Sequence, residues 1–301
     1  VLKEQIKQFR DVQKKQSLSR GENIKKAGII DVIQKIIDEN IKVSSVDVTN
    51  KWAKIHNPLS LSRFVFGTKA QTLERLQTMV KNATILDQMR FTVEDWQTKK
   101  ETILEIIQNK INTPKIVIRS SALNEDTWSY SNAGFFHSEI NVDKTSKDEL
   151  EQGITNVIQS YYKVSDHSPM NQVFVQPHIS NVKLSGVIFT RDLKNGSPYF
   201  ILNYTTHTDR TDAVTAGDSK TNTKVIYKFG KFNPKEKEFS KLIALAQELE
   251  GLINYDSLDI EFAINNQNEY FLFQVRPLVA HAHNQIVSDK DIQKELECAK
   301  N

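Results

Sequence analysis

The sequence predicts an α+β fold with two lobes, in which mixed or antiparallel sheets carry flanking helices and follow a small, mostly helical N-terminal segment. Residues 1–40 carry apolar side chains at helical spacing. From Lys115 onward, short β-rich runs bounded by Pro, Gly, Asn or Asp predominate. Helical patterns interrupt these runs without a regular strand-helix-strand alternation, and this indicates an α+β class.

The chain is expected to divide into three parts. Residues 1–62 form the N-terminal segment, which ends near the turn at Asn57-Pro58. Residues 63–280 form the main two-lobed domain, and residues 281–301 read as a linker. Because the chain begins with Val1 and not with Met, we expect it to be a piece of a longer polypeptide.

The main domain is predicted to begin with two helices and to continue mainly with strands. Residues 68–82 and 92–110 each place their apolar side chains on one helical face. Two further helices follow, one opened by a capping box of Ser146 and Glu149 and the other by Asn233-Pro234. The predicted strands are Ile116–Ile118, Val173–Val175, Gly186–Phe189 and Tyr199–Leu202.

Composition excludes several classes of function. The chain has 301 residues, with 40 Lys and Arg against 37 Asp and Glu, and its net charge of +3 is spread along its length. This charge gives no basic footprint for nucleic acid. No apolar run approaches the roughly 20 residues that span a bilayer, so no membrane partner is expected. The single cysteine, Cys298, is typical of a reducing cytoplasm, where we expect the protein to reside.

Residues 258–277 predict an antiparallel hairpin with a polar face. The alternation from Leu258 to Ile264 puts Asp259 and Glu261 together on the face opposite the apolar side chains. In the second strand, Phe271, Phe273 and Val275 are expected on the apolar face, with Gln274 and Arg276 opposite. A four-residue loop over 266–269 would pair three sets of residues: Asn265 with Tyr270, Glu261 with Gln274, and Asp259 with Arg276.

These polar residues suit a site for a metal and a phosphate. Two carboxylates two residues apart on a strand provide the oxygen ligands that Mg²⁺ prefers. Arg276, across the strand, can hold a phosphate oxygen. The alternative is a surface hairpin whose outer face carries a cross-strand salt bridge, and the hairpin alone leaves both readings open.

Other segments add groups that bind anions. Arg119 is placed at a strand end beside the hydroxyls of Ser120 and Ser121. Ala133-Gly134 lies in a polar loop whose backbone N–H groups could approach a phosphate closely. Lys69 opens a helix whose free N–H groups and dipole favour an anion.

Together these segments resemble the N-terminal nucleotide-binding domain of the phosphoenolpyruvate synthase and pyruvate phosphate dikinase family, which has an ATP-grasp fold. The resemblance covers about residues 66–277 and keeps the family's order of motifs. The matching stretches are Gly67-Thr68-Lys69-Ala70, Val117-Ile118-Arg119-Ser120-Ser121-Ala122 with Glu125-Asp126, Ser131-Asn132-Ala133-Gly134, Val175-Gln176, Ser185-Gly186-Val187-Ile188-Phe189-Thr190-Arg191-Asp192, and Asp259-Ile260-Glu261 with Gln274-Val275-Arg276-Pro277.

The resemblance implies a role for each of these residues. It implies that ATP is bound with Mg²⁺, and that its phosphates contact three cations, Lys69, Arg119 and Arg276. It further implies that Asp259 and Glu261 hold the metal with support from Gln274. The same resemblance places Ala133 and Gly134 in a loop over the triphosphate, and the strand around Gln176 beside the adenine.

The resemblance also implies partners beyond the nucleotide. In this family a histidine on a separate swivelling domain carries the phosphoryl group, and no histidine of this chain lies in such a motif, so we expect a downstream phosphohistidine domain. The segment Tyr204–Gly217 is similar to the L-glutamine kinase branch of capsular phosphoramidate synthesis, which makes L-glutamine the favoured acceptor, with AMP and Pi formed. Residues 1–62 look like the tail of a sugar nucleotidyltransferase. Two alternatives remain: pyruvate as the acceptor, and a non-catalytic module that senses ATP.

Overall fold

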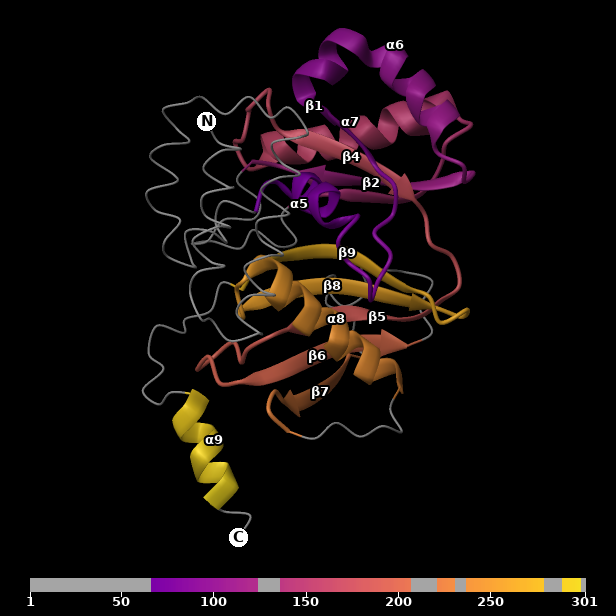
Figure 1. Ribbon diagram of the computed structural model, residues 1–301. Coiled ribbons are helices and arrows are strands. Elements are labelled where there is room, and N and C mark those ends of the chain that lie inside the picture. The colour runs from indigo at the N-terminus through magenta and orange to yellow at the C-terminus, as the bar shows by residue number, and fades with distance from the viewer. Residues whose placement is uncertain (1–65, 124–135, 207–220, 231–236, 279–288, 299–301) are drawn as a thin grey trace, which may run out of the picture.

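The computed structural model of the chain describes residues 66–123, 136–206, 221–230, 237–278 and 289–298. The predicted N-terminal segment 1–62, the loop that holds Ala133 and Gly134, and most of the linker after residue 280 lie outside these ranges. Within them the chain folds into two antiparallel sheets, stacked one above the other in Figure 1.

The first sheet has four strands in the order β1-β4-β2-β3, and all neighbours are antiparallel. Helices α6 and α7 cover the face that points away from the second sheet (Figure 1). Apolar side chains from these helices and strands form one core, with Ile118, Ile154 and Val173 fully buried. The elements are β1 (Met89–Thr92), α6 (Val93–Lys110), β2 (Lys115–Ser121), β3 (Ser138–Asp143), α7 (Lys147–Lys163) and β4 (Gln172–Pro177).

The second sheet has five strands in the order β7-β6-β5-β8-β9, again antiparallel throughout. Gly186 of β5 is required by close packing, because a Cβ there would lie 2.2 Å from the carbonyl oxygen of Asn203. The elements are β5 (Val182–Phe189), β6 (Tyr199–Thr206), β7 (Asn222–Tyr227), α8 (Lys237–Ile253), β8 (Leu258–Asn265) and β9 (Tyr270–Pro277), followed by α9 (Asp289–Cys298).

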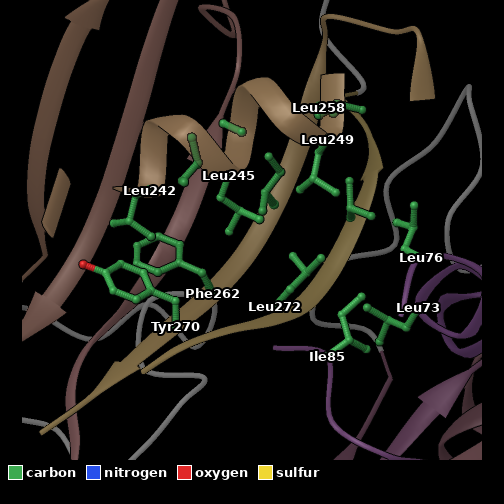
Figure 2. Packing of buried hydrophobic residues seen from close by; sticks show 14 of the residues in the cluster. Leu73, Leu76, Ile85, Leu242, Leu245, Leu249, Leu258, Phe262, Tyr270 and Leu272 are labelled. Carbon is green, nitrogen blue, oxygen red and sulfur yellow. The ribbon is translucent and has the colours of Figure 1, made fainter. Parts of the chain in front are cut away.

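A second core lies on the α8 side of the five-stranded sheet. Figure 2 shows Leu242, Leu245 and Leu249 of α8 over Phe262 and Leu272 of the hairpin. The short helix α5 (Lys69–Leu76) packs its buried face into the same core. Since α5 also contacts β2 of the other sheet, it joins the two halves of the molecule.

The predicted strands correspond to β2, β4, β5, β6, β8 and β9, whereas β1, β3 and β7 were not predicted. Helix α6 begins after the N-cap Thr92 and ends at Lys110, as expected. Helix α5 was predicted over 68–82 but ends at Leu76. Just after its end, the Gln77 side-chain amide donates to the Ile85 carbonyl. At α7 the capping box is only half formed. Ser146 accepts from the Glu149 N–H, but the Glu149 carboxylate accepts from Asp143.

The hairpin of β8 and β9 contains a β-bulge that the alternating pattern did not predict. Asp259 pairs with Arg276 and Glu261 with Gln274, as expected, but Phe262 pairs with Leu272, so Phe273 is the extra residue of β9. The predicted pair of Asn265 and Tyr270 is therefore wrong, and Ile264 takes the place opposite Tyr270.

The bulge also changes the face on which two aromatic rings lie. Phe271 and Phe273 pack with Ala263 and Val182 in a separate cluster, whereas Leu272 and Val275 enter the α8 core. The prediction that Phe271 and Phe273 share the apolar face of Val275 is wrong, because one inserted residue reverses the facing of every residue before it.

The α+β class, with two antiparallel sheets and flanking helices, is confirmed, and it is consistent with the predicted ATP-grasp architecture. Within the ranges described above, no helix combines the length and apolar character needed to cross a bilayer.

Candidate functional site

A pocket lies between the two sheets, on the side of the hairpin opposite the α8 core. Its walls come from β2, β3 and β4 of the four-stranded sheet, from the segment after β4 that holds Ile179, and from one residue each of β8 and β9. The lining residues are Val117, Arg119, Ser138, Ile140, Gln176, Pro177, Ile179, Glu261 and Phe273. Three residues predicted for the site, Arg119, Gln176 and Glu261, therefore meet at one pocket.

Arg119 joins the two sheets across this pocket. Its Nη2 donates to Glu261 Oε2 over 3.0 Å, and its Nη1 donates to the Phe273 carbonyl over 3.1 Å. The guanidinium also lies over the rings of Phe174 and Phe273, at 5.7 and 5.9 Å from their centroids. Arg119 was predicted to lie at a strand end. This is wrong, because Arg119 lies inside β2, opposite Phe174 of β4. This placement fixes the guanidinium between two strands of the first sheet and two of the second.

Arg276 and Asp259 form a second ion pair, within the hairpin. Arg276 donates from Nε over 2.9 Å and from Nη2 over 2.6 Å, both to Asp259 Oδ2. The two side chains are only 12% and 9% exposed. The alternative reading of the sequence predicted a cross-strand salt bridge, and this pair is one. It is buried, however, whereas that reading placed it on a solvated surface.

Positive charge concentrates around Glu261. Burial alone would raise the pKa of this carboxyl, but the nearby charges of Arg119, Lys69 and Arg276 outweigh burial and hold its pKa below the ordinary value. Glu261 is therefore ionised at neutral pH. Since Lys69 and Arg276 act on the same carboxylate as Arg119, the three predicted cations share one location, with Asp259 beside them.

The start of α5 contributes a side chain to the site but not free backbone N–H groups. Thr68 and Gln71 form a reciprocal capping box. The Ala70 N–H donates to Ser121 Oγ over 3.0 Å. The N–H groups of Thr68, Ala70 and Gln71 are thus engaged within the protein and do not provide the open donors predicted here. Only the Lys69 ammonium remains of that predicted contribution.

Three oxygen-bearing side chains could hold a hard cation. Asp259, Glu261 and Gln274 occupy adjacent register positions of β8 and β9, and Gln274 is 2% exposed. Two carboxylates and an amide oxygen suit Mg²⁺, which takes few protein ligands when phosphates and water complete its shell. Within the described residues, no cluster of three or more His, Cys, Asp or Glu side chains could bind a metal without such help.

Some contributions escaped the sequence analysis. Phe174 and Phe273 sandwich Arg119, and Gln88 bonds to Gln176. The two rings gave no signal because isolated aromatic residues in strands are ordinary core residues. Gln88 directly precedes β1, after Ile85, Leu86 and Asp87, in a stretch that carries no motif. Ala133 and Gly134 lie outside the described residues, so their predicted role stays a prediction.

No protein-family model and no curated protein matches the sequence. Among solved structures, the chain is similar to the D-alanine-D-alanine ligase from Coxiella burnetii, with a TM-score of 0.43 and 11% identity over 79% of this chain and 63% of that one. It is also similar to the D-alanine-D-alanine ligase from Helicobacter pylori, with a TM-score of 0.40 and 15% identity over 79% of this chain and 60% of that one. A third similar structure is a RimK domain ATP-grasp protein from Sphaerobacter thermophilus, with a TM-score of 0.39 and 13% identity over 74% of this chain and 63% of that one.

The chain spans about three fifths of the length of these structures, that is, 60 to 63%. None of the three is a phosphoenolpyruvate synthase, so that kinship stays a prediction. Assignment of function consequently rests on the chain's own residues: an α+β protein with a charged pocket between two antiparallel sheets.

Proposed function

We propose that this chain is the MgATP-binding part of an ATP-grasp phosphotransferase of the phosphoenolpyruvate synthase type. The observation that carries the proposal is the bond from Arg119 to Glu261, 3.0 Å long, which brings a predicted phosphate ligand and a predicted metal ligand together from different sheets. Their positions in the sequence are 142 residues apart. A solvated strand face would not require such a convergence.

The charges around the pocket suit a nucleoside triphosphate. Lys69, Arg119 and Arg276 all lower the pKa of Glu261, so all three act on one small region. Phosphoryl transfer needs positioning and charge neutralisation more than covalent chemistry from the protein. Three cations that are fixed before substrate arrives would supply this neutralisation.

Each of the predicted site residues then has a defined role in binding MgATP. Arg119 and Arg276 would exchange their carboxylate partners for phosphate oxygens, and Lys69 would add a further charge. Asp259, Glu261 and Gln274 would hold Mg²⁺, which when bound neutralises charge on the phosphates. The apolar walls around Val117 and Ile140 would take the base and exclude water. Transfer would occur in line with a nucleophile that this chain positions but does not itself supply.

The nucleophile proposed is a histidine on a downstream domain. This proposal rests on the sequence, in which no histidine lies in the carrier motif of the family that the chain resembles. We propose L-glutamine as the final acceptor, with AMP and Pi formed, on the basis of the sequence from Tyr204 to Gly217. Pyruvate is the second candidate, and an ATP sensor without transfer is the third.

The first experiment tests the metal and phosphate roles in the full-length protein. Glu261→Ala is expected to abolish ATP turnover, with a loss of at least about 100-fold, because it removes a metal ligand and the partner of Arg119. The matched control is Glu105→Ala, since Glu105 is exposed on α6, which covers the face of the four-stranded sheet that points away from the pocket. Normal turnover by Glu261→Ala would remove the roles assigned to this hairpin.

A second experiment identifies the acceptor. Phosphorus NMR of full-length protein with MgATP is run with L-glutamine and with pyruvate in separate samples. A new resonance from a phosphorus-nitrogen bond with glutamine selects the glutamine kinase. Phosphoenolpyruvate with pyruvate selects the synthase. Binding of ATP without turnover under either condition selects the sensor.

A further inference from the structure

Besides the charged Arg119 and Glu261, two polar side chains line the pocket between the sheets, Ser138 and Gln176, and Gln176 carries an amide. Gln176 of β4 lies opposite Val117 of β2 and is 2% exposed. The surroundings of its amide are apolar, with Val117, Ile140 and Ile179 on the pocket wall. A buried amide in such a setting strongly constrains the hydrogen bonds of any ligand that covers it.

The orientation of this amide is determined by a chain of hydrogen bonds. Gln88 Nε2 donates to the Ala70 carbonyl over 2.6 Å, and a carbonyl can only accept. Gln88 must therefore turn its NH₂ group toward Ala70 and its Oε1 toward Gln176. Gln176 Nε2 in turn donates to Gln88 Oε1 over 3.3 Å. Among the described residues, the Gln176 side chain makes this one hydrogen bond.

The first member of this series of hydrogen bonds, Ala70, is held firmly in place. Ala70 is fully buried in α5, and its own N–H donates to Ser121 Oγ. The carbonyl that orients Gln88 thus belongs to the helical turn that carries Lys69. Because the oxygen and nitrogen of an amide point apart, fixing Gln176 Nε2 toward Gln88 turns Gln176 Oε1 away from Gln88 and leaves it as an acceptor for a ligand.

We infer that Gln88 is a positioning residue that presents Gln176 Oε1 to the nucleobase and so selects a 6-aminopurine over a 6-oxopurine. The inference rests on the proposed function, since it concerns the base of the same nucleotide. An amino group at position 6 donates to Gln176 Oε1. An oxo group there would set two acceptors against each other, with no donor between them.

The test compares ATP with inosine triphosphate, which differs from ATP at the 6 position and its neighbouring ring nitrogen. Binding of each, with Mg²⁺, is measured by calorimetry on the full chain and on two variants, Gln88→Leu and Gln88→Glu. Both variants lose the donor to Ala70. Gln88→Glu keeps an acceptor for Gln176 Nε2, whereas Gln88→Leu removes it, so a merely structural role would affect both alike.

The unmodified protein is expected to bind ATP at least about tenfold more tightly than inosine triphosphate. In Gln88→Leu the ratio of the two dissociation constants should fall to within about threefold of one. The Gln176 amide can then flip and present either its oxygen or its NH₂ group to the base. In Gln88→Glu the ratio should stay near that of the unmodified protein.

Three outcomes would overturn the inference alone: equal binding of both nucleotides by the unmodified protein, an unchanged ratio in Gln88→Leu, or an equal change in both variants. Failure of the unmodified protein to bind either nucleotide would instead overturn the proposed function, and the inference with it.

Discussion

Two clusters of charged side chains border the five-stranded sheet, and they differ in what they connect. The pocket cluster contains Arg119, Glu261, Arg276 and Asp259, with Lys69 close by. The second is here called the strut cluster, and its members lie near the ends of β5, β7 and α8 and at the start of α9. They are Arg191, Lys228, Glu250, Asp256 and Asp289.

The strut cluster is self-contained. Arg191 bonds to Asp256 and Asp289 and also to the Gly196 carbonyl, while Lys228 pairs with Glu250 over 2.5 Å. Glu250 belongs to α8 and Asp289 to α9, while Gly196 and Asp256 lie in the connections that precede β6 and β8 of the five-stranded sheet. In the pocket cluster, by contrast, Arg119 reaches Glu261 from the other sheet.

Buried ion pairs alone therefore do not identify a site in this molecule. The strut cluster contains as many charges as the pocket cluster, and its geometry is as close. What distinguishes the pocket cluster is the crossing between sheets beside a pocket, with three cations around one carboxylate. We expect substitutions in the strut cluster to lower stability alone, and substitutions in the pocket cluster to impair ATP binding or turnover as well.

The largest effect is expected for Arg276→Ala. The change leaves the Asp259 carboxylate, 9% exposed, without the guanidinium that neutralises it. The free energy of unfolding from urea titration should fall by about 3–5 kcal/mol, and ATP turnover of the full-length protein should be lost. The double variant Asp259→Leu, Arg276→Met should recover much of the stability but none of the turnover. A loss below about 1 kcal/mol for Arg276→Ala would contradict the burial of this pair.

A smaller loss of stability, with no change in ATP affinity, is expected for Lys228→Met in the strut cluster. Burial raises the pKa of Glu250, and the charge of Lys228 opposes this rise. Without Lys228 the free energy of unfolding should fall by about 3 kcal/mol at pH 7. A carboxyl whose pKa is raised by folding favours the folded state when protonated, so the variant should regain stability as the pH falls toward 4.5.

The measurement is urea unfolding at several pH values, together with ATP calorimetry at neutral pH. A marked loss of ATP affinity in Lys228→Met would break the separation between the two clusters.

The smallest change in stability is expected for Glu261→Gln. Because the pKa of Glu261 is held below its ordinary value of 4.5, its contribution is present above pH 4.5 and is lost as the pH falls through the lower folded-state value. The variant should be about 1–2 kcal/mol less stable than the unmodified protein at pH 7. Below pH 4.5 the two unfolding free energies should converge. A constant difference across this range would show that Arg119 does not interact with an ionised Glu261.

The local parts of this structure could be predicted from the sequence. The N-cap Thr92 with Asp95, together with the apolar spacing that follows, marks where α6 begins and which face it buries. The alternation from Leu258 to Ile264 places Asp259 and Glu261 on one face of β8. The pairing of Asp259 with Arg276, predicted from a four-residue loop, was confirmed although the register at the turn was wrong, because the bulge at Phe273 offsets the difference of one residue.

The remaining features depend on contacts that no local pattern contains. Residues 270–273 are apolar without interruption, so nothing in them marks Phe273 as the bulged residue. Met79 continues the apolar spacing of α5, yet the helix ends at Leu76 in a turn whose Gln77 amide bonds to Ile85. The bond from Arg119 to Glu261 joins two sheets, and therefore required the tertiary structure.

The bulge at Phe273 divides the hairpin into two mechanically separate parts. Between the bulge and Arg276, strand register places charged side chains at the pocket, whereas the far part, with its turn at Asn265–Glu269, contributes apolar side chains to the α8 core and to the cluster that contains Phe271. Residues 266–269 at the hairpin tip are exposed and do not line the pocket. The tip is therefore a place where a spectroscopic label could report on this protein away from the charges that give the pocket its character.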